Sequence, residues 1–178
     1  MTPDEKWLGL WRIEENNKQW TFASRKKNPF VVGPDAVVIV PILRDKLLGD
    51  KLVVISEYRT VLGGREYSFP AGLIDEKEAI IEAAKRELFE ETGLVVTKIL
   101  QMSPVVYSSA GMTDESVAFA VVEVTGTATC KNQEKTEDIQ VLLLNEKQTS
   151  DLARQKNEFV SAKISAKTWP FLLTWTKL

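Results

Sequence analysis

The stretch GLIDEKEAIIEAAKRELFEETGL, residues 72–94, combines a helical repeat with a high density of acidic side chains. Its apolar residues recur at Ile80, Ala84 and Leu88, which is the spacing of one buried face of an amphipathic helix. Its seven acidic and three basic residues give it a formal charge of −4, against −2 for the whole chain. We therefore expect a helix that packs on a core with one face and carries carboxylates on another.

Signals for the two ends of this helix are also present. Asp75 followed by Glu78 is typical of a capping box, so we expect the helix to begin there. Gly93 is the residue type that ends a helix in the left-handed conformation, so the helix is expected to reach Thr92. The preceding residues 59–74 are rich in glycine and contain a proline, and they are expected to form a loop.

Three acids near the end of the predicted helix share one face, because Glu87 lies four residues before Glu91 and three before Glu90. Like-charged pairs at these spacings cost about 0.2–0.5 kcal/mol each, and the helix dipole disfavours anions in the last turn. One interpretation is a solvated acidic face that pairs locally with Lys85 and Arg86. The other is a site for a hard cation, Mg²⁺ or Mn²⁺, which clustered carboxylates favour.

The overall composition limits the chemistry further. The chain contains no histidine, which excludes Ser-His-Asp and Cys-His catalysis and zinc sites built on imidazole. Its one cysteine, Cys130, cannot form an internal disulfide or a cysteine-rich metal site. The 23 basic and 25 acidic residues leave a formal charge of −2, so we expect no nucleic-acid partner. An enzyme of this composition would work through carboxylates, Lys, Arg, Tyr, Ser or a hard metal ion.

Length and hydropathy indicate one globular domain with a small extension, because 178 residues is the usual size of a single domain. The longest apolar run, residues 36–43, is far shorter than the roughly 18 residues that span a bilayer, so no membrane association is expected. Residues 1–6 lack the basic and apolar regions of a signal peptide. With a single cysteine as well, we expect a cytoplasmic protein.

The remaining elements are expected to complete an α/β domain over residues 35–178, preceded by a polar and aromatic N-terminal arm over residues 1–34. Short β-branched runs predict strands, and the Gly49-Asp50 turn suggests that the first two form a hairpin. The predicted strands are 36–40, 52–55, 95–96, 117–124 and 141–144, and the predicted helices are 149–155 and 169–175. Residues 125–138 are expected to form a loop or an exposed hairpin.

The spacing within residues 72–94 resembles the signature of the Nudix hydrolases at every defined position. Read along the chain, the matching residues are Gly72, Glu78 after five residues, Arg86-Glu87-Leu88 after seven more, Glu90-Glu91 and Gly93-Leu94. This agreement favours the cation site over the solvated acidic face. The resemblance implies an α/β/α sandwich, in which a mixed β-sheet lies between helices. It also implies hydrolysis of a nucleoside diphosphate linked to another group, with Mg²⁺ or Mn²⁺ as the cofactor.

The resemblance also implies roles for the residues of this signature, residues 72–94, which is called the box below. Glu87 and Glu91 would be catalytic metal ligands, and Glu90 would be a further ligand or a base beside the metal. The backbone carbonyl of Ala71 would complete the coordination. Glu78 would orient or support the metal site. Arg86 would be structural and would pair with a carboxylate of the box. Bound cations neutralise a diphosphate and lower the pKa of a coordinated water, so the protein would mainly position the substrate and accept one proton.

Segments outside the box resemble the branch of the family that hydrolyses ADP-ribose and other nucleoside diphosphate sugars. They are Glu57-Tyr58-Arg59, Phe69-Pro70-Ala71-Gly72, the arm segment from Trp20 to Arg25, and the loop from Ser108 to Glu115. The substrate-binding residues implied are Trp20, Arg25, Glu57, Arg59, Ser109, Gly111 and Met112. Glu115 would be a general base or an additional metal anchor.

Two departures from the branch pattern widen the expected substrate range. Ala110 stands where ADP-ribose-specific members often have proline, and Ser68 stands where many relatives have glutamate. GDP-mannose, UDP-sugars and ADP-sugars are therefore expected beside ADP-ribose. Two alternatives stay open: a pyrophosphohydrolase of nucleoside triphosphates or dinucleoside polyphosphates, and a non-catalytic nucleotide-sugar-binding domain. Because relatives can exchange the N-terminal arm between subunits, the resemblance also implies a homodimer.

Overall fold

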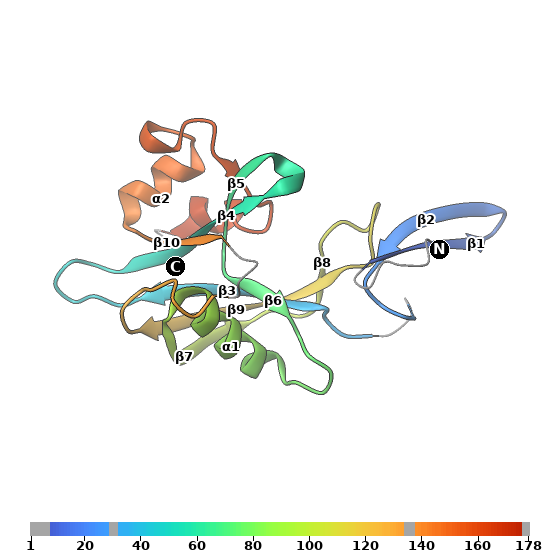
Figure 1. The fold of residues 1–178 in the computed structure, drawn as a ribbon, viewed down its shortest axis with the longest axis horizontal. Helices are drawn as coiled ribbons and strands as arrows, with labels where there is room; N and C mark the ends of the chain where they lie inside the picture. The colour runs from blue at the N-terminus through green and yellow to red at the C-terminus, as the bar shows by residue number, and fades with distance from the viewer. Residues whose placement is uncertain (1–7, 29–31, 134–137, 176–178) are drawn as a thin grey trace.

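A computed structural model describes residues 8–28, 32–133 and 138–175 of the chain (Figure 1). The strands are β1 (Gly9–Glu15), β2 (Lys18–Ser24), β3 (Ala36–Leu43), β4 (Lys51–Arg59), β5 (Gly64–Ser68), β6 (Ala71–Leu73), β7 (Val95–Met102), β8 (Val106–Tyr107), β9 (Ser116–Thr125), β10 (Ile139–Leu144) and β11 (Lys163–Ile164). The helices are α1 (Ile80–Thr92), α2 (Glu146–Ala153) and α3 (Trp169–Thr174), and 3₁₀ turns cover Thr60–Leu62 and Asn157–Phe159.

One large mixed sheet forms the centre of the molecule. Its strand order is β11-β5-β4-β3-β9-β7, and β10, β6 and β8 pair with β4, β3 and β9 respectively. β3 and β9 run parallel over their matched length, whereas β7 pairs with β9 in the antiparallel direction. The predicted strand at residues 95–96 is thus the start of a longer strand, because β7 continues along the sheet edge to Met102.

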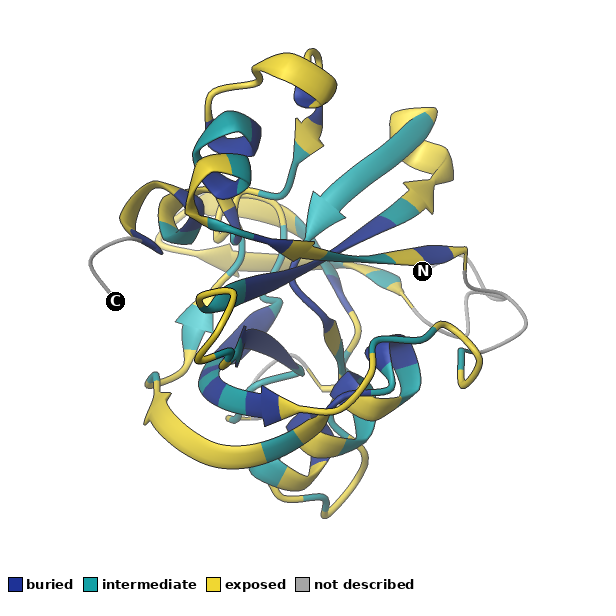
Figure 2. Cartoon of the chain, turned by 90° about the vertical axis from the view of Figure 1, so that its left-hand side faces the viewer, coloured by how far each residue is buried: buried dark blue, intermediate teal, exposed yellow. Residues whose placement is uncertain are grey.

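Alternate side chains of β3 enter two separate cores, because successive residues of a strand point to opposite faces of the sheet. Val37 and Ile39 belong to the core beneath α1. Val38 and Val40 belong to the core formed with α2 and α3. The buried residues lie along the strands between these two helical layers (Figure 2). The predicted α/β/α sandwich with a mixed sheet is confirmed.

The predicted hairpin of the first two core strands forms only at its tip. β3 and β4 pair at Ile42 with Leu52 and at Leu43 with Lys51, next to the predicted turn. Beyond these pairs the strands separate: β3 continues beside β6 and β9, and β4 beside β5 and β10. This divergence opens the sheet at the carboxyl end of β4.

Two other predictions from local sequence were wrong in their bounds. Residues 59–74 were expected to be a loop, yet they contain a 3₁₀ turn, β5 and β6, because pairing with β4 and β3 overrides the weak strand propensity of this glycine-rich segment. The helix predicted over 149–155 begins at Glu146. Asn145 caps it in a reciprocal capping box with Gln148, a signal present in the sequence.

The N-terminal hairpin of β1 and β2 is a two-stranded sheet of its own and projects from one end of the body (Figure 1). Its attachment is at the end of β2, where the amide of Ala23 donates to the carbonyl of Met112 over 2.8 Å. Hence the arm meets the loop between β8 and β9. None of the helices in the described part of the chain is long and apolar enough to cross a membrane.

Candidate active site

Helix α1 begins at Ile80, five residues after the predicted start. Lys77 has a φ of 69°, which interrupts a right-handed helix, and Ala79 is the N-cap without a side-chain bond. One half of the predicted capping box exists, since the Glu78 carboxylate accepts from the amide of Asp75 over 3.0 Å, but it closes a turn before the helix. The C-terminal end is as predicted: Gly93 has a φ of 70° and stops the helix.

The buried face of α1 fixes the direction in which its acids point. Ala84 and Leu88 of the predicted apolar stripe are fully buried against the sheet, together with Ala83, while Ile80 is partly buried. Glu87 and Glu90 follow on the sides of the helix that the core leaves free. The hydrophobic packing of the helix therefore places its carboxylates at the edge of the sheet opening.

Arg86 connects the helix with the segment before it. Its guanidinium binds Glu78 through two bonds of 3.0 and 2.9 Å and donates to the carbonyl of Leu73 over 3.0 Å. The hydrogen bonds with Arg86 lower the pKa of Glu78 to about 2, and the same contacts raise the pKa of Arg86. Two-pronged binding of this kind fixes orientation as well as distance. Arg86 thus holds the turn after β6 against α1.

The same guanidinium also contacts two of the predicted metal ligands. It lies 2.7 Å from a carboxylate oxygen of Glu87 and 3.3 Å from one of Glu90. The Glu87 carboxylate fills the space beside Gly72, where an added Cβ would stand only 1.9 Å from its Cδ. A residue without a side chain is therefore required at position 72 for the Glu87 carboxylate to occupy this place.

Glu91 is the most deeply buried acid of the helix, with 4% of its surface exposed. Its carboxylate accepts a hydrogen bond from the backbone amide of Ala71 over 3.1 Å. A buried carboxylate is costly unless polar partners surround it. Glu91 and Ala71, two predicted members of one metal site, therefore lie in contact although they are 20 residues apart.

The donors at this end of α1 suit a hard divalent cation in their chemistry, because they are carboxylate oxygens next to the backbone of β6. The absence of a side chain at Gly72 leaves room for one of these carboxylates, that of Glu87, beside β6. In the described part of the chain, however, no three acidic, cysteine or histidine side chains are grouped as a ready metal site. Glu87 and Glu90 are instead ion-paired with Arg86.

A cavity of about 220 Å³ opens next to Glu91. Its wall combines the ends of β4, β5 and β6 with the turn before α3, and its polar lining includes Arg59, Glu66, Ser68, Glu91, Lys167 and Thr168. Two cations and two carboxylates therefore face the same space. The cavity brings Arg59, predicted to bind substrate, next to the predicted metal ligand Glu91.

Within this cavity Arg59 is held by neighbouring acids. Its guanidinium lies 2.8 Å from Glu57 and 3.7 Å from Glu66, which is opposite Glu57 across the β4–β5 ladder. About half of the Arg59 side chain remains exposed. Glu57 thus orients Arg59 in this structure, a different task from the direct substrate contact that the sequence resemblance implied for it.

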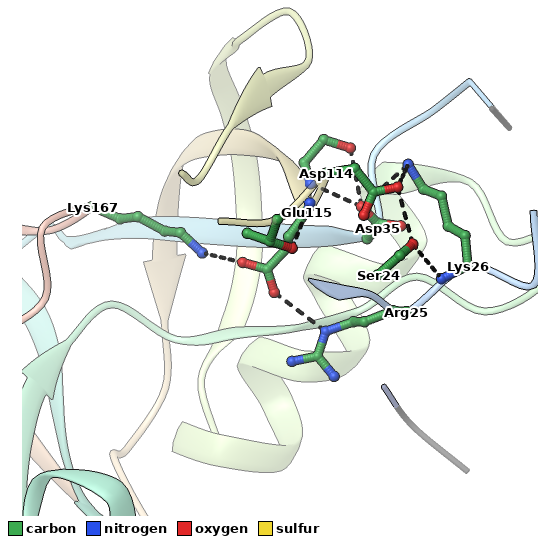
Figure 3. Close-up of polar contacts among 9 residues, drawn as sticks. Ser24, Arg25, Lys26, Asp35, Asp114, Glu115 and Lys167 are labelled. Atoms are coloured by element: carbon green, nitrogen blue, oxygen red, sulfur yellow. Dashed lines mark hydrogen bonds and ion pairs between the residues drawn. The ribbon is translucent and has the colours of Figure 1, made fainter. Parts of the chain in front are cut away.

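Glu115 lies between two cations that come from opposite ends of the described chain (Figure 3). Arg25 approaches one carboxylate oxygen to 3.2 Å from the arm, and Lys167 approaches the other to 3.3 Å from the turn before α3. Burial alone would raise the pKa of Glu115, but its polar neighbours and the cations Lys167 and Arg25 outweigh it and lower the pKa. Glu115 is therefore held as an anion.

A second polar cluster fixes the residue before Glu115. Ser24 donates to Asp114 over 3.0 Å, and Lys26 lies 3.5 Å from Asp35 and 4.0 Å from Asp114 (Figure 3). Asp35 in turn accepts from the amide of Ser116 over 2.8 Å. The end of the arm thus binds the loop that carries Glu115 through several polar contacts.

The other predicted substrate contacts lie away from the cavity. Trp20 is exposed on β2, and Met112 is exposed in the loop before β9, where its carbonyl bonds to the arm. Neither they nor Ser109 and Gly111 belong to the cavity wall. Within this single chain, the structure therefore gathers Arg59, Ala71 and Glu91 at the cavity but leaves these four outside it.

Sequence reasoning missed the turn that closes the cavity, which contributes Ser165, Lys167 and Thr168. No motif marks these residues, because the segment looks like an ordinary polar connection. The signal that places them is tertiary: Thr168 accepts from the amide of Phe69, 99 residues earlier in the chain, over 3.0 Å.

A comparison with protein families identifies the family to which this chain belongs. The NUDIX domain model matches residues 33–165. The chain belongs to the NUDIX family. It shares 37% identity over 129 residues with a Saccharomyces cerevisiae protein named ADP-ribose pyrophosphatase, which covers 69% of this chain and 55% of the yeast protein.

Two further NUDIX relatives match over shorter stretches. The mouse ADP-sugar pyrophosphatase is 32% identical over 92 residues, covering 52% of this chain and 42% of the mouse protein. The Escherichia coli ADP compounds hydrolase NudE is 42% identical over 80 residues, covering 42% of this chain and 40% of NudE. The chain thus spans about half the length of the curated relatives it matches.

Proposed function

We propose that this NUDIX protein hydrolyses the diphosphate bond of nucleoside diphosphate sugars such as ADP-ribose or GDP-mannose. The products would be a nucleoside monophosphate and a sugar phosphate. One observation carries the proposal: the complete box of residues 72–94 is built around α1, with Glu91 facing a cavity that also holds Arg59. The names of the relatives, an ADP-ribose pyrophosphatase and an ADP-sugar pyrophosphatase, support this substrate class.

We assign the metal site to Glu87, Glu90, Glu91 and the carbonyl of Ala71, with Mg²⁺ as the ion. Carboxylate and carbonyl oxygens are the ligands that Mg²⁺ prefers. Bound there, the ion would neutralise phosphate charge and lower the pKa of a water molecule. For Glu87 and Glu90 to serve, they must exchange Arg86 for the ion. Arg86 can release Glu87 and Glu90 without leaving its place, because it keeps its two bonds to Glu78 and its bond to the carbonyl of Leu73.

The cavity would take the diphosphate end of the substrate. Its volume of about 220 Å³ is below the roughly 300–1,000 Å³ of a site that encloses a whole ligand, so the base would lie outside it. Arg59 suits phosphate oxygens because its planar guanidinium can donate two parallel bonds. Glu115, kept ionised, would accept the proton of the attacking water as the phosphorus–oxygen bond breaks.

We further propose that the arm, residues 1–34, acts across a homodimer. Trp20 is exposed on the arm and lies away from the cavity of its own chain. Exchange of arms would bring Trp20 to the neighbouring subunit's substrate, beside that subunit's own loop around Ser109, Gly111 and Met112. Analytical ultracentrifugation of the full chain and of a Trp20→Ala variant, with KM for ADP-ribose, tests this arrangement.

The decisive experiment measures turnover of ADP-ribose, GDP-mannose and deoxynucleoside triphosphates by the parent chain and by Glu91→Gln. Products are identified by mass spectrometry in ¹⁸O-labelled water, with and without Mg²⁺. The glutamine can still accept the bond from Ala71, so the fold should persist, while loss of a metal ligand should lower kcat by orders of magnitude. Turnover of Glu91→Gln within a few-fold of the parent would refute the metal assignment.

Two other outcomes would change the function itself. Preferred release of pyrophosphate from triphosphates would favour a nucleoside triphosphate pyrophosphohydrolase. Tight binding of nucleotide sugars without any Mg²⁺-dependent hydrolysis would favour a binding domain, although the box residues are all present in this chain.

A further inference from the structure

Lys167 stands at the junction of the cavity and Glu115. Its side chain lines the cavity that Arg59 and Glu91 share. Its ammonium lies 3.3 Å from the carboxylate of Glu115, on the side opposite Arg25 (Figure 3). The Lys167 side chain is 33% exposed, so it is accessible from the cavity.

The backbone that carries Lys167 is fixed on both sides. The amide of Ser165 donates to the carbonyl of Tyr67 over 2.9 Å, and Thr168 accepts from the amide of Phe69 over 3.0 Å. A further bond of 3.0 Å from the amide of Thr168 to the carbonyl of Ser165 closes the turn. The Lys167 ammonium can therefore change partners by side-chain rotation while its backbone stays in place.

Among the residues that the structure describes, the charges that pair with Glu115 leave one cation in excess. A single carboxylate faces both Arg25 and Lys167, and either cation alone would balance it. In the cavity, Arg59 is already paired with Glu57 and Glu66. Lys167 can therefore turn to an incoming anion while Glu115 keeps Arg25 as its ion-pair partner. Arg59 would have to give up contacts with two acids to do the same.

We propose that Lys167 is a phosphate-binding residue of this site, which exchanges Glu115 for an oxygen of the substrate's diphosphate. The proposal rests on the proposed function for the identity of the ligand. A diphosphate attracts an ammonium more strongly than a single carboxylate does, because it carries more negative charge. Glu115 keeps its ion pair with Arg25 after the exchange. Its other oxygen, which faced Lys167, is then available to accept the proton of the attacking water.

The test is equilibrium binding without turnover. Isothermal titration calorimetry with α,β-methylene ADP-ribose in Mg²⁺ compares the parent with Lys167→Gln, Lys167→Arg and Lys156→Gln. Lys156 is an exposed cation outside the cavity wall, so its variant controls for loss of one charge. We expect Kd to rise at least tenfold for Lys167→Gln, to stay within about threefold for Lys167→Arg, and to be unchanged for Lys156→Gln.

Adenosine separates the phosphate contact from the rest of the ligand, and its affinity should be the same for all four proteins. Equal Kd values for the parent and Lys167→Gln would overturn the proposal. A fall in kcat for Lys167→Gln with Kd and KM unchanged would overturn it too, because Lys167 would then act only by positioning Glu115. The binding readouts require no hydrolysis, so a failure of the proposed activity is seen separately, as absent turnover in the parent.

A second test uses the unaltered chain, so that the proposal can still be tested if the Lys167→Gln variant does not fold. Lysines are acetylated with acetic anhydride and mapped by mass spectrometry, with and without α,β-methylene ADP-ribose. We expect acetylation of Lys167 to slow at least threefold when the analogue is bound, and that of Lys156 to stay the same. Equal rates at Lys167 in both conditions would contradict the exchange.

Discussion

The carboxylate of Glu87 occupies the space that a side chain at Gly72 would need. An added Cβ at residue 72 would stand 1.9 Å from Cδ of Glu87 and 2.0 Å from Oε1. The obstacle is the far end of a flexible side chain, so it can move without disturbing the backbone. Gly72 is therefore required for the placement of Glu87 more than for the stability of the fold.

Gly72→Ala is expected to displace Glu87 and, if Glu87 is the metal ligand proposed above, to lower kcat for ADP-ribose at least 100-fold. Its melting temperature, followed by circular dichroism, should stay within a few degrees of the parent. Gly9→Ala is the control for an added methyl group, since a Cβ there would meet its nearest atom at an ordinary 3.5 Å and Gly9 is not part of the cavity wall. Full activity in Gly72→Ala would show that Glu87 does not need this position.

Acid should weaken the fold through Glu78. The bonds from Arg86, and then the amide of Asp75, lower the pKa of Glu78 from 4.5 to about 2. Between these values the unfolded chain binds a proton at Glu78 that the folded chain does not, so this contribution is complete above pH 4.5 and is lost as the pH falls toward 2. Glu78→Gln should be less stable than the parent at pH 6.

The urea midpoints of the parent and Glu78→Gln, measured at several pH values from 6 to 2.5, test this linkage. The parent's midpoint should fall more steeply with acid than that of the variant, and the two should converge at low pH. Curves that stay parallel over the whole range would mean that Glu78 titrates alike in the folded and unfolded chains.

The packing of α1 gives a prediction for stability. Leu88 is fully buried against the sheet, so Leu88→Ala should lower the free energy of unfolding by about 2–5 kcal/mol. Phe89 is the next residue of the same helix and is 47% exposed, so Phe89→Ala should cost clearly less. Chemical denaturation of both variants measures the two values. Equal losses would show that the helix is not held by the face that contains Leu88.

The central helix could be predicted closely because its signals are local. The repeat through Ala84 and Leu88 fixes its buried face, and Gly93 fixes its end. Its start was mistaken because the sequence pattern of Asp75 and Glu78 is that of a capping box, whereas in the structure only the Glu78 half forms, in a turn that the left-handed Lys77 separates from the helix.

The part of the site that could not be predicted depends on long-range contacts. β5 and β6 have few apolar residues of their own, and neighbouring strands decide their conformation. Lys167 reaches the cavity because a parallel pairing of β11 with β5 brings its turn beside β6. Periodicity and spacing carry no information about such a pairing, so the box was visible in the sequence but the closing side of the cavity was not.

The bond that joins this closing turn to the sheet can be tested directly. Thr168 is 1% exposed, and its hydroxyl accepts from the buried amide of Phe69 over 3.0 Å. Thr168→Val keeps the shape but leaves that amide without an acceptor, which should cost about 1–3 kcal/mol of unfolding free energy. Thr174→Val removes an exposed hydroxyl that bonds to Pro170 of its own helix, and it should cost less than about 0.5 kcal/mol. Equal urea midpoints for the two variants would show that the Thr168–Phe69 bond does not hold the turn in place.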